Sequence, residues 1–150
     1  MIIVLFGQPH SGKTTLAREL DNNHYLLDGD RFREVFQDKN FTREGRIKNL
    51  NRASDITVFM HSIYNKLTLS MVYPYQEARD YLNEMCNRLG IEIFWVHLEY
   101  TGERGREAFH VKDFELPSPE ATVLPLSTTH NSIEECVNKI KQYVGQKDSH

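Results

Sequence analysis

The chain has 150 residues, of which 39% are hydrophobic and 26% are charged, and its formal net charge is −3. Such a chain forms one globular domain with room for a hydrophobic core, and its charge argues against a general nucleic-acid-binding protein. No apolar run is long enough to span a membrane. The two cysteines, Cys86 and Cys136, lack C-x-x-C spacing, so we expect buried reduced thiols and a cytoplasmic protein.

The first apolar run, residues 2–6, predicts a buried strand, and a helix is expected to begin at residue 14. Between them, residues 7–14 match the phosphate-binding pattern G-x-x-x-x-G-K-[ST] in full. The loop begins so early that no signal peptide is expected. Lys13 would reach the β- and γ-phosphates, and the Thr14 hydroxyl would ligate Mg²⁺. The pattern predicts a nucleoside triphosphate site made by Gly7, Gln8, Pro9, His10, Ser11, Gly12, Lys13, Thr14 and Thr15.

Strands and helices alternate along the rest of the chain. We expect strands over residues 24–28, 67–72, 91–97 and 121–124, and helices over residues 43–66, over residues 76–89 and from residue 133 onward. The alternation indicates one α/β domain over residues 1–150, with a parallel sheet covered on both faces and ligands at the carboxyl ends of the strands. The longest helix should bury Ile47, Leu50, Ala53, Ile56, Phe59 or Met60, and Ile63.

Two aspartates end the second predicted strand in the sequence Asp28-Gly29-Asp30. Carboxylates at this place would face the phosphate loop across the mouth of the sheet. Phosphoryl transfer needs one group that orients or deprotonates the acceptor hydroxyl and help in holding Mg²⁺, and two aspartates can divide these tasks. An Asp-Gly turn in which Asp30 caps the next helix is the alternative. The phosphate loop in the same chain favours catalytic roles for Lys13, Asp28 and Asp30.

Positive charge is concentrated in residues 31–52, which hold seven Lys or Arg residues against three acids. In a helix, Arg46, Asn49 and Arg52 share one face because they are three residues apart. Arginine binds oxyanions in a bidentate way, so this stretch suits an anionic acceptor. A solvated helix face accounts for some of these charges but not obviously for all of them.

These motifs, in this order, resemble those of adenylylsulfate kinases, which phosphorylate the 3′-hydroxyl of adenosine 5′-phosphosulfate (APS) to give PAPS in sulfate assimilation. The resemblance runs nearly end to end. It includes Leu27-Asp28-Gly29-Asp30 with Arg33 (L-D-G-D-x-x-R), Phe41 with Arg46 and Asn49 (F-x-x-x-x-R-x-x-N), Pro74-Tyr75 with Arg79 (P-Y-R-x-x-R, in part), Arg104 (Q-R-D), Val111-Lys112-Asp113-Phe114 (I-K-x-F) and Ser132-Ile133-Glu134-Glu135-Cys136-Val137 (S-V-E-E-C-V).

The resemblance implies a P-loop NTPase-type three-layer domain with a five-stranded parallel sheet of order 2-3-1-4-5. It implies ATP with Mg²⁺, held in part by Thr14 and Asp28, and it places Asp30 near the acceptor hydroxyl and Arg104 over the adenine of ATP. Phe41 and Phe114 would sandwich the adenine of APS, and residues 101–118 would close over the substrates. A homodimer is compatible with the resemblance. The residues assigned to APS are Arg33, Phe41, Arg46, Asn49, Tyr73, Lys112 and Phe114.

Three features depart from the family pattern. The lid sequence D-x-K-G-L-Y-K-K-A is missing, with only seven residues between Arg104 and Lys112, and Arg106 is a candidate substitute for its charge. Tyr73 replaces the serine of the family's S-P-Y. Residues 8–10 replace the family's L-S-G.

Two other functions stay open at this point. A kinase for a nucleoside, a nucleotide or a polynucleotide 5′-hydroxyl would share the phosphate loop and an aspartate after the second strand. It would have no reason to keep Phe41, Arg46, Asn49 and Phe114 together. A regulatory module that binds nucleotide without turnover is favoured only by the shortened lid, and it would not need both Asp28 and Asp30.

Overall fold

The fold is built on one parallel sheet, described in a computed structural model for residues 1–20, 25–101 and 110–148. The five strands stand in the order β2-β3-β1-β4-β5, and every neighbouring pair is parallel. The predicted fold class and strand order are therefore confirmed. The strands are β1 (Ile2–Phe6), β2 (Tyr25–Asp28), β3 (Leu67–Ser70), β4 (Ile93–Glu99) and β5 (Val123–Ser127).

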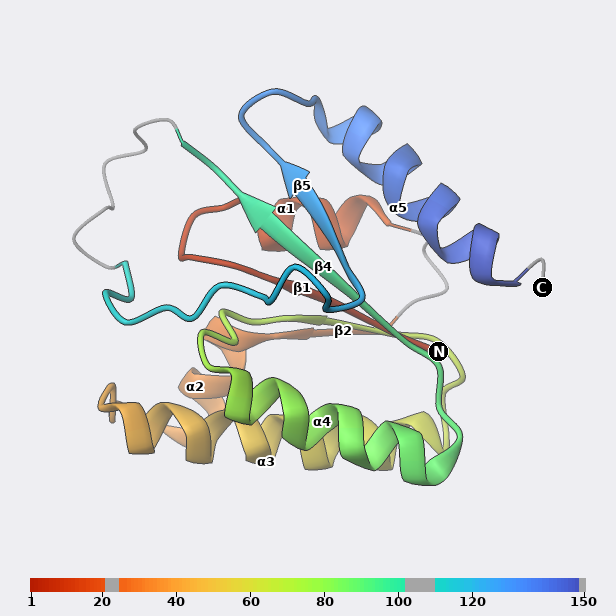
Figure 1. Ribbon diagram of the computed structural model, residues 1–150. Coiled ribbons are helices and arrows are strands. Elements are labelled where there is room, and N and C mark those ends of the chain that lie inside the picture. The colour runs from red at the N-terminus through yellow and green to blue at the C-terminus, as the bar shows by residue number, and fades with distance from the viewer. Residues whose placement is uncertain (21–24, 102–109, 149–150) are drawn as a thin grey trace.

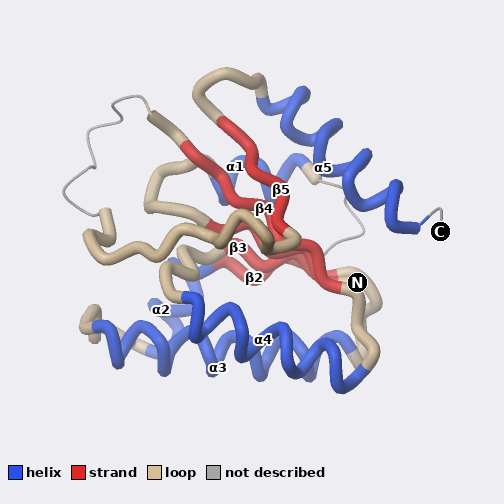
Figure 2. The backbone as a smooth tube through the Cα atoms, viewed as in Figure 1, coloured by secondary structure: helices blue, strands red, loops and turns tan. Residues whose placement is uncertain are grey.

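Helices cover both faces of the sheet, as Figures 1 and 2 show. Helices α1 (Lys13–Glu19) and α5 (Ile133–Asp148) lie on one face, and α2 (Gly29–Phe36), α3 (Arg43–His61) and α4 (Gln76–Leu89) lie on the other. Alternate side chains of β1 enter the two cores. Ile2, Val4 and Phe6 join the core beneath α3 and α4, whereas Ile3 and Leu5 join the core beneath α1 and α5.

The ends of α3 and β5 differ from the sequence expectation. Helix α3 ends at His61 and not at residue 66, because the chain must turn before Leu67 pairs with Ile2 of β1. Ile63 therefore lies beyond the helix and is 60% exposed, so its predicted burial is wrong. Strand β5 begins two residues later than expected and contains Pro125, which an edge strand tolerates because it has only one ladder of hydrogen bonds to satisfy.

Helix caps follow the local signals in the sequence. The Thr42 hydroxyl accepts a hydrogen bond from the backbone N–H of Gly45 at 3.1 Å and so caps α3. Ser132 and Glu135 form the predicted capping box before α5, with the two bonds at 3.1 and 3.2 Å. Gly90 ends α4 in the left-handed conformation, with φ of 69°.

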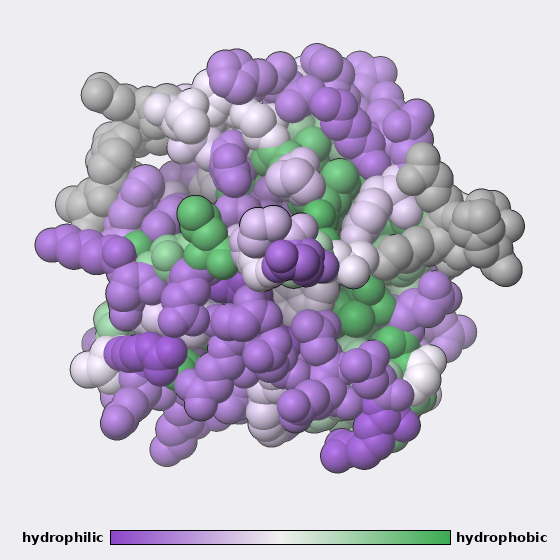
Figure 3. All heavy atoms as spheres, viewed as in Figure 1, coloured by the Kyte–Doolittle hydropathy of each residue, from purple (hydrophilic) through white to green (hydrophobic). Residues whose placement is uncertain are grey.

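The distribution of side chains between the core and the surface agrees with the composition of the chain. Cys86 and Cys136 are both buried and free, as predicted. Within the described part of the chain, no helix combines the length and the apolar character that a membrane span requires. Figure 3 shows a largely hydrophilic surface over α3, α4 and α5, with apolar side chains gathered near the middle of the same face.

Tyr73 anchors one buried polar contact inside the larger core. Its side chain is fully buried, its ring meets Trp95 edge-on at 5.4 Å, and its hydroxyl lies 2.7 Å from the Ser54 hydroxyl. Burial raises the pKa of Tyr73, so the phenol stays neutral. The hydroxyl pair therefore satisfies two polar groups that no solvent reaches.

We predict that Tyr73→Phe lowers the free energy of unfolding by about 1–2 kcal/mol, because it leaves the buried Ser54 hydroxyl without this partner. Adding Ser54→Ala should recover part of that loss, since both polar groups are then absent. Urea unfolding of the two single variants and the double variant measures this. If the loss of unfolding free energy in the double variant equals the sum of the two single losses, the pairing is contradicted.

Candidate active site

The phosphate loop joins β1 to α1 and depends on unusual backbone angles. Gly7 has φ of +151°, and a Cβ on it would lie 2.3 Å from the carbonyl oxygen of Leu98 in β4. Gly12 caps α1 with φ of 94°. His10 also has a positive φ, 68°, at the place where the family pattern has glycine. The loop therefore needs both glycines and holds His10 in a conformation that side chains seldom adopt.

Lys13 folds back over the loop. Its Nζ donates to the carbonyl oxygens of Gly7 and Gln8 at 3.1 and 2.8 Å, and its distance to Ser11 Oγ is 3.4 Å. Desolvation lowers the pKa of Lys13 to about 8, against the opposing effect of the Asp30 and Asp28 carboxylates. Phosphate oxygens in the loop would replace the carbonyl partners and favour the charged amine.

Asp28 ties the end of β2 to the phosphate loop. Its Oδ1 accepts a hydrogen bond from Thr14 Oγ1 at 3.0 Å, and its Oδ2 accepts one from the backbone N–H of Arg31 at 3.4 Å. Asp28 is thus the N-cap of α2, so the alternative in which Asp30 holds this position is wrong. Asp30 lies in the first turn of α2, where its exposed side chain faces the cavity beside the loop.

One cavity of about 1340 Å³ brings most of the predicted site residues together. The phosphate loop and the start of α1 form one side, the end of β2 with α2 forms another, and the start of α3, the segment from Ser70 to Pro74 and residues 110–111 form the rest. This is the carboxyl edge of the sheet, where ligands bind in such folds. Predicted site residues that line it are Pro9, His10, Gly12, Lys13, Thr14, Thr15, Asp28, Asp30, Arg33, Phe41, Arg46 and Asn49.

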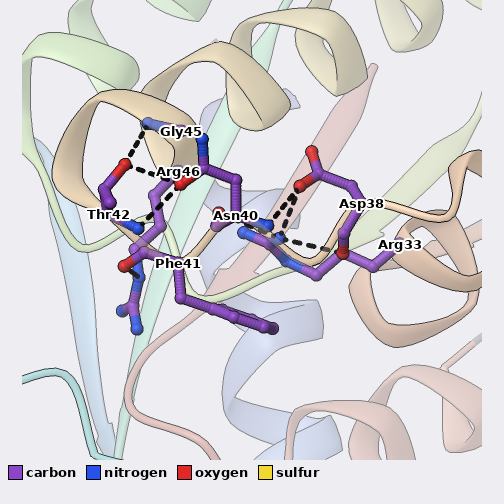
Figure 4. Close-up of polar contacts among 7 residues, drawn as sticks. All are labelled: Arg33, Asp38, Asn40, Phe41, Thr42, Gly45 and Arg46. Carbon is purple, nitrogen blue, oxygen red and sulfur yellow. Dashed lines mark hydrogen bonds and ion pairs between the residues drawn. The ribbon is translucent and has the colours of Figure 1, made fainter.

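Two arginines flank the Phe41 ring in this cavity (Figure 4). The guanidinium carbons of Arg33 and Arg46 lie 4.4 and 5.7 Å from the ring centroid. Arg33 forms an ion pair with Asp38 at 3.2 Å, and Arg46 Nε donates to the backbone oxygen of Phe41 at 2.9 Å. Desolvation lowers the pKa of Arg33, opposed mainly by Asp38. The cluster presents two fixed guanidinium groups beside an exposed aromatic face.

The turn before α3 holds this cluster in place (Figure 4). Asn40 Oδ1 accepts hydrogen bonds from the N–H and the hydroxyl of Thr42 at 3.1 and 2.7 Å. A Cβ on Gly45 would lie 2.2 Å from Asn40 Cγ, so only glycine leaves room for the amide. Sequence reasoning missed Asp38, Asn40 and Gly45. The available signals were Asn two residues before a capping Thr and a glycine in a first helical turn.

The segment after residue 110 does not complete the predicted adenine sandwich. We name residues 110–116 the strap. Phe114 in the strap stacks on His97 with ring centroids 5.6 Å apart, and it lines a second cavity of about 430 Å³ together with Lys112. Phe41 lines the first cavity and not this one, so the structure does not bring the two phenylalanines together.

Other predicted residues lie elsewhere or outside the described part of the chain. Gln8 and Ser11 face the second cavity. The prediction that Tyr73 contacts substrate is wrong for its side chain, because a fully buried hydroxyl that pairs with Ser54 cannot reach a ligand. Gly7 is buried within the loop, and Arg104 and Arg106 are outside the described residues.

Comparison with known proteins identifies adenylylsulfate kinases among the relatives. A family model described as adenylylsulphate kinase matches residues 1–112. The adenylyl-sulfate kinase of Clostridium kluyveri is 29% identical over 173 aligned residues, covering 98% of this chain and 84% of the relative. That of Saccharomyces cerevisiae is 30% identical, covering 95% of this chain and 82% of the relative. The first alignment is longer than this chain, so that relative has residues without a counterpart here.

A solved structure shows the same fold. The Mycobacterium tuberculosis APS kinase, determined in complex with AMPPNP and APS, superposes with a TM-score of 0.75 at 20% identity. The match covers 96% of each chain. At this identity the likeness concerns the fold, and it agrees with the sheet order found here.

We predict that Lys13 makes stability rise with pH between about 8 and 10.5. The folded pKa of about 8 lies below the 10.5 of the free side chain, so the unfolded chain binds more protons in this window. Relative to Lys13→Met, the unmodified protein should gain about 1–2 kcal/mol of unfolding free energy between pH 7.5 and 9.5. Urea unfolding at both pH values tests this. Parallel pH profiles for the two proteins would contradict it.

We predict that Gly45→Ala lowers the free energy of unfolding by on the order of 1 kcal/mol, because the new methyl group displaces Asn40 from Thr42. Gly145→Ala in α5 is the matched control, since its Cβ would meet nothing within 4 Å. The control should raise stability by up to about 1 kcal/mol through helix propensity. Thermal or urea unfolding measures both. A similar gain for both variants would show that Asn40 is not held by this contact.

Proposed function

Because this chain belongs to the adenylylsulphate kinase family, we propose that it transfers the γ-phosphoryl group of ATP to the 3′-hydroxyl of APS, giving PAPS and ADP. The observation that supports this best is a single cavity in which three groups meet. The phosphate loop and the start of α1 contribute Lys13, the end of β2 and the first turn of α2 contribute Asp28 and Asp30, and α2 and the start of α3 contribute Arg33 and Arg46. Nucleotide, catalytic carboxylate and anionic acceptor can therefore share one space.

The loop suits the phosphates of ATP with Mg²⁺. Thr14 Oγ1 and Asp28 Oδ1 are hard oxygen ligands 3.0 Å apart, which is the donor chemistry that Mg²⁺ prefers. No group of three or more His, Cys, Asp or Glu residues that could hold a metal ion occurs among the described residues. This fits a metal that binds through one carboxylate, one hydroxyl and the substrate phosphates. When bound, it would neutralise charge on the transferring phosphoryl group.

Asp30 has the better position for the base. Asp28 is already engaged with Thr14 and with the N-terminus of α2, whereas the Asp30 carboxylate is exposed toward the cavity. In the proposed reaction the 3′-hydroxyl gives its proton to Asp30 as its oxygen bonds to the γ-phosphorus. The bond from that phosphorus to the β–γ bridging oxygen breaks, and ADP leaves. Lys13 stabilises the charge on the transferring group.

The acceptor would lie between α2 and the start of α3. Arg33 and Arg46 supply charge-assisted donors for the phosphosulfate, and the exposed Phe41 ring between them can stack on the adenine. Asn49 is only 2% exposed but lines the cavity, and its Oδ1 has no hydrogen-bond partner among the described residues, so a ligand that reaches it could donate to this oxygen. Phe114 can join the adenine only after its ring leaves His97.

A kinase for another hydroxyl acceptor is the second candidate, and the separation of Phe41 from Phe114 favours it. The non-catalytic alternative is weaker, because Lys13, Asp28 and Asp30 converge where binding alone would not require them.

We also propose a cytoplasmic location, since both buried, unpaired thiols suit a reducing compartment. A homodimer stays a prediction.

A coupled ADP-release assay tests the function. The unmodified protein is assayed with ATP and Mg²⁺ against APS, nucleosides and 5′-hydroxyl oligonucleotides. We expect ADP release that depends on APS, together with formation of PAPS. Turnover with another acceptor and none with APS would support the second candidate. Binding of ADP without turnover on any acceptor would support a regulatory module.

We predict that Asp30→Asn lowers kcat by at least about a hundredfold and changes the affinity for ATP by less than about threefold, because the amide cannot accept the proton. Steady-state kinetics and titration with ADP measure the two effects. Asp28→Asn is the comparison variant and should weaken nucleotide binding in the presence of Mg²⁺. If Asp30→Asn instead lost nucleotide affinity and Asp28→Asn lost only kcat, the two roles would be exchanged.

A further inference from the structure

The side chain of Gln8 joins the phosphate loop to the strap. Gln8 Oε1 accepts a hydrogen bond from the backbone N–H of Val111 at 2.8 Å, and Gln8 Nε2 donates to the backbone oxygen of Val111 at 2.9 Å. One carboxamide thus satisfies both main-chain groups of a residue that is 5% exposed. The two residues are 103 positions apart in the chain, so this pair fixes a long-range contact.

The other end of the strap is held by different elements. Tyr75 donates its hydroxyl hydrogen to Asp113 at 2.9 Å, and the backbone N–H of Glu115 donates to the oxygen of Pro74 at 2.7 Å. Arg79 also donates to the backbone oxygen of Glu115. These contacts belong to the turn before α4 and to α4 itself. The strap therefore bridges the phosphate loop and the α4 side of the sheet.

Gln8 is also in direct contact with the phosphate-binding amine. Its backbone oxygen accepts the shortest of the hydrogen bonds from Lys13 Nζ, at 2.8 Å. A phosphate group in the loop would draw Lys13 away from this oxygen, because a charge-assisted bond to an anion is stronger than one to a carbonyl. Gln8 thus contacts Lys13 through its backbone oxygen and Val111 of the strap through its side chain.

We propose that Gln8 is a positioning residue that couples nucleotide occupancy of the phosphate loop to the position of the strap. When Lys13 leaves the carbonyl oxygen of Gln8, the backbone conformation of residue 8 changes. The Gln8 carboxamide transmits this change to Val111 through its two hydrogen bonds. Lys112 and Phe114 follow Val111 in the strap and line the second cavity. Val111 itself lines the first cavity, so the nucleotide thereby sets the position of the strap beside both cavities. An apolar residue at position 8, as in the L-S-G of the family pattern, cannot make this pair.

Hydrogen exchange of the Val111 amide tests the coupling without any acceptor. The unmodified protein, Gln8→Leu and Gln8→Glu are compared with and without ADP and Mg²⁺. Gln142→Leu on the exposed side of α5 is the matched control. Without ADP, Gln8→Leu should speed exchange of the Val111 amide at least about tenfold, the change expected for one lost hydrogen bond. ADP should alter this exchange at least threefold in the unmodified protein and in the control, but not in Gln8→Leu.

Gln8→Glu keeps an acceptor for the Val111 N–H and lacks the donor for its carbonyl, so intermediate exchange is expected. It also decides the question if Gln8→Leu does not fold. ADP affinity is measured by calorimetry in each folded variant, so that exchange is compared at the same saturation with ADP. Two results would overturn the proposal: an ADP effect on Val111 that survives in Gln8→Leu, or no ADP effect in the unmodified protein.

A second measurement rests on the proposed function. The affinity for APS is measured with and without ADP, and the ratio of the two dissociation constants gives the coupling. We expect a ratio of at least threefold in the unmodified protein and in Gln142→Leu, and a ratio near one in Gln8→Leu. An unchanged ratio in Gln8→Leu would overturn the coupling. Failure of the unmodified protein to bind APS would count against the proposed function, whereas the exchange measurement would still decide the role of Gln8.

Discussion

The parallel pairing of β1 with β3 on one side and β4 on the other is the constraint on which the rest of the structure depends. It buries all five residues of β1, and the phosphate loop follows directly at the carboxyl end of this strand. It also brings the carboxyl end of β4 so close that Gly7 packs on the oxygen of Leu98. Because β2 pairs with β3 in register, Asp28 arrives opposite Ser70 at the same edge as the loop. Main-chain hydrogen bonds of the sheet thus bring the phosphate loop and Asp28 to the same edge.

Three charged groups at this edge have partners within the protein. The loop carbonyls hold Lys13, Thr14 donates to Asp28, and Asp38 is paired with Arg33. Each of these partners is one that a nucleotide, a metal ion or an anionic acceptor can replace. The free protein therefore keeps its charged groups solvated by its own atoms in the geometry in which ligands would meet them. Such preorganisation reduces the reorganisation that binding and catalysis require.

The sequence predicted the features that follow from local patterns. The loop, the capping box and the buried thiols were predicted because glycine spacing and apolar periodicity are local signals, whereas the strand order was predicted from the resemblance to adenylylsulfate kinases. It did not predict where α3 ends or that Ile63 is exposed, since that boundary depends on where β3 must begin to pair with β1. Tyr73 was misplaced for a similar reason. A tyrosine in a substrate motif and a tyrosine bonded to Ser54 differ only in tertiary context. The stacking of Phe114 on His97 could not be predicted from the sequence either, because the two residues are far apart in the chain.

The Arg33–Asp38 pair has a consequence for which molecules can enter the cavity. Asp38 acts as a resident counter-ion, and the side chains of the pair are only 19% and 14% exposed. A neutral alcohol or sugar has no charge to offer in exchange and would have to leave the pair intact or expose it without compensation. An incoming anion can take over the guanidinium and free the carboxylate to turn toward water. The ion pair therefore favours an anionic acceptor over a neutral one at this point of the cavity.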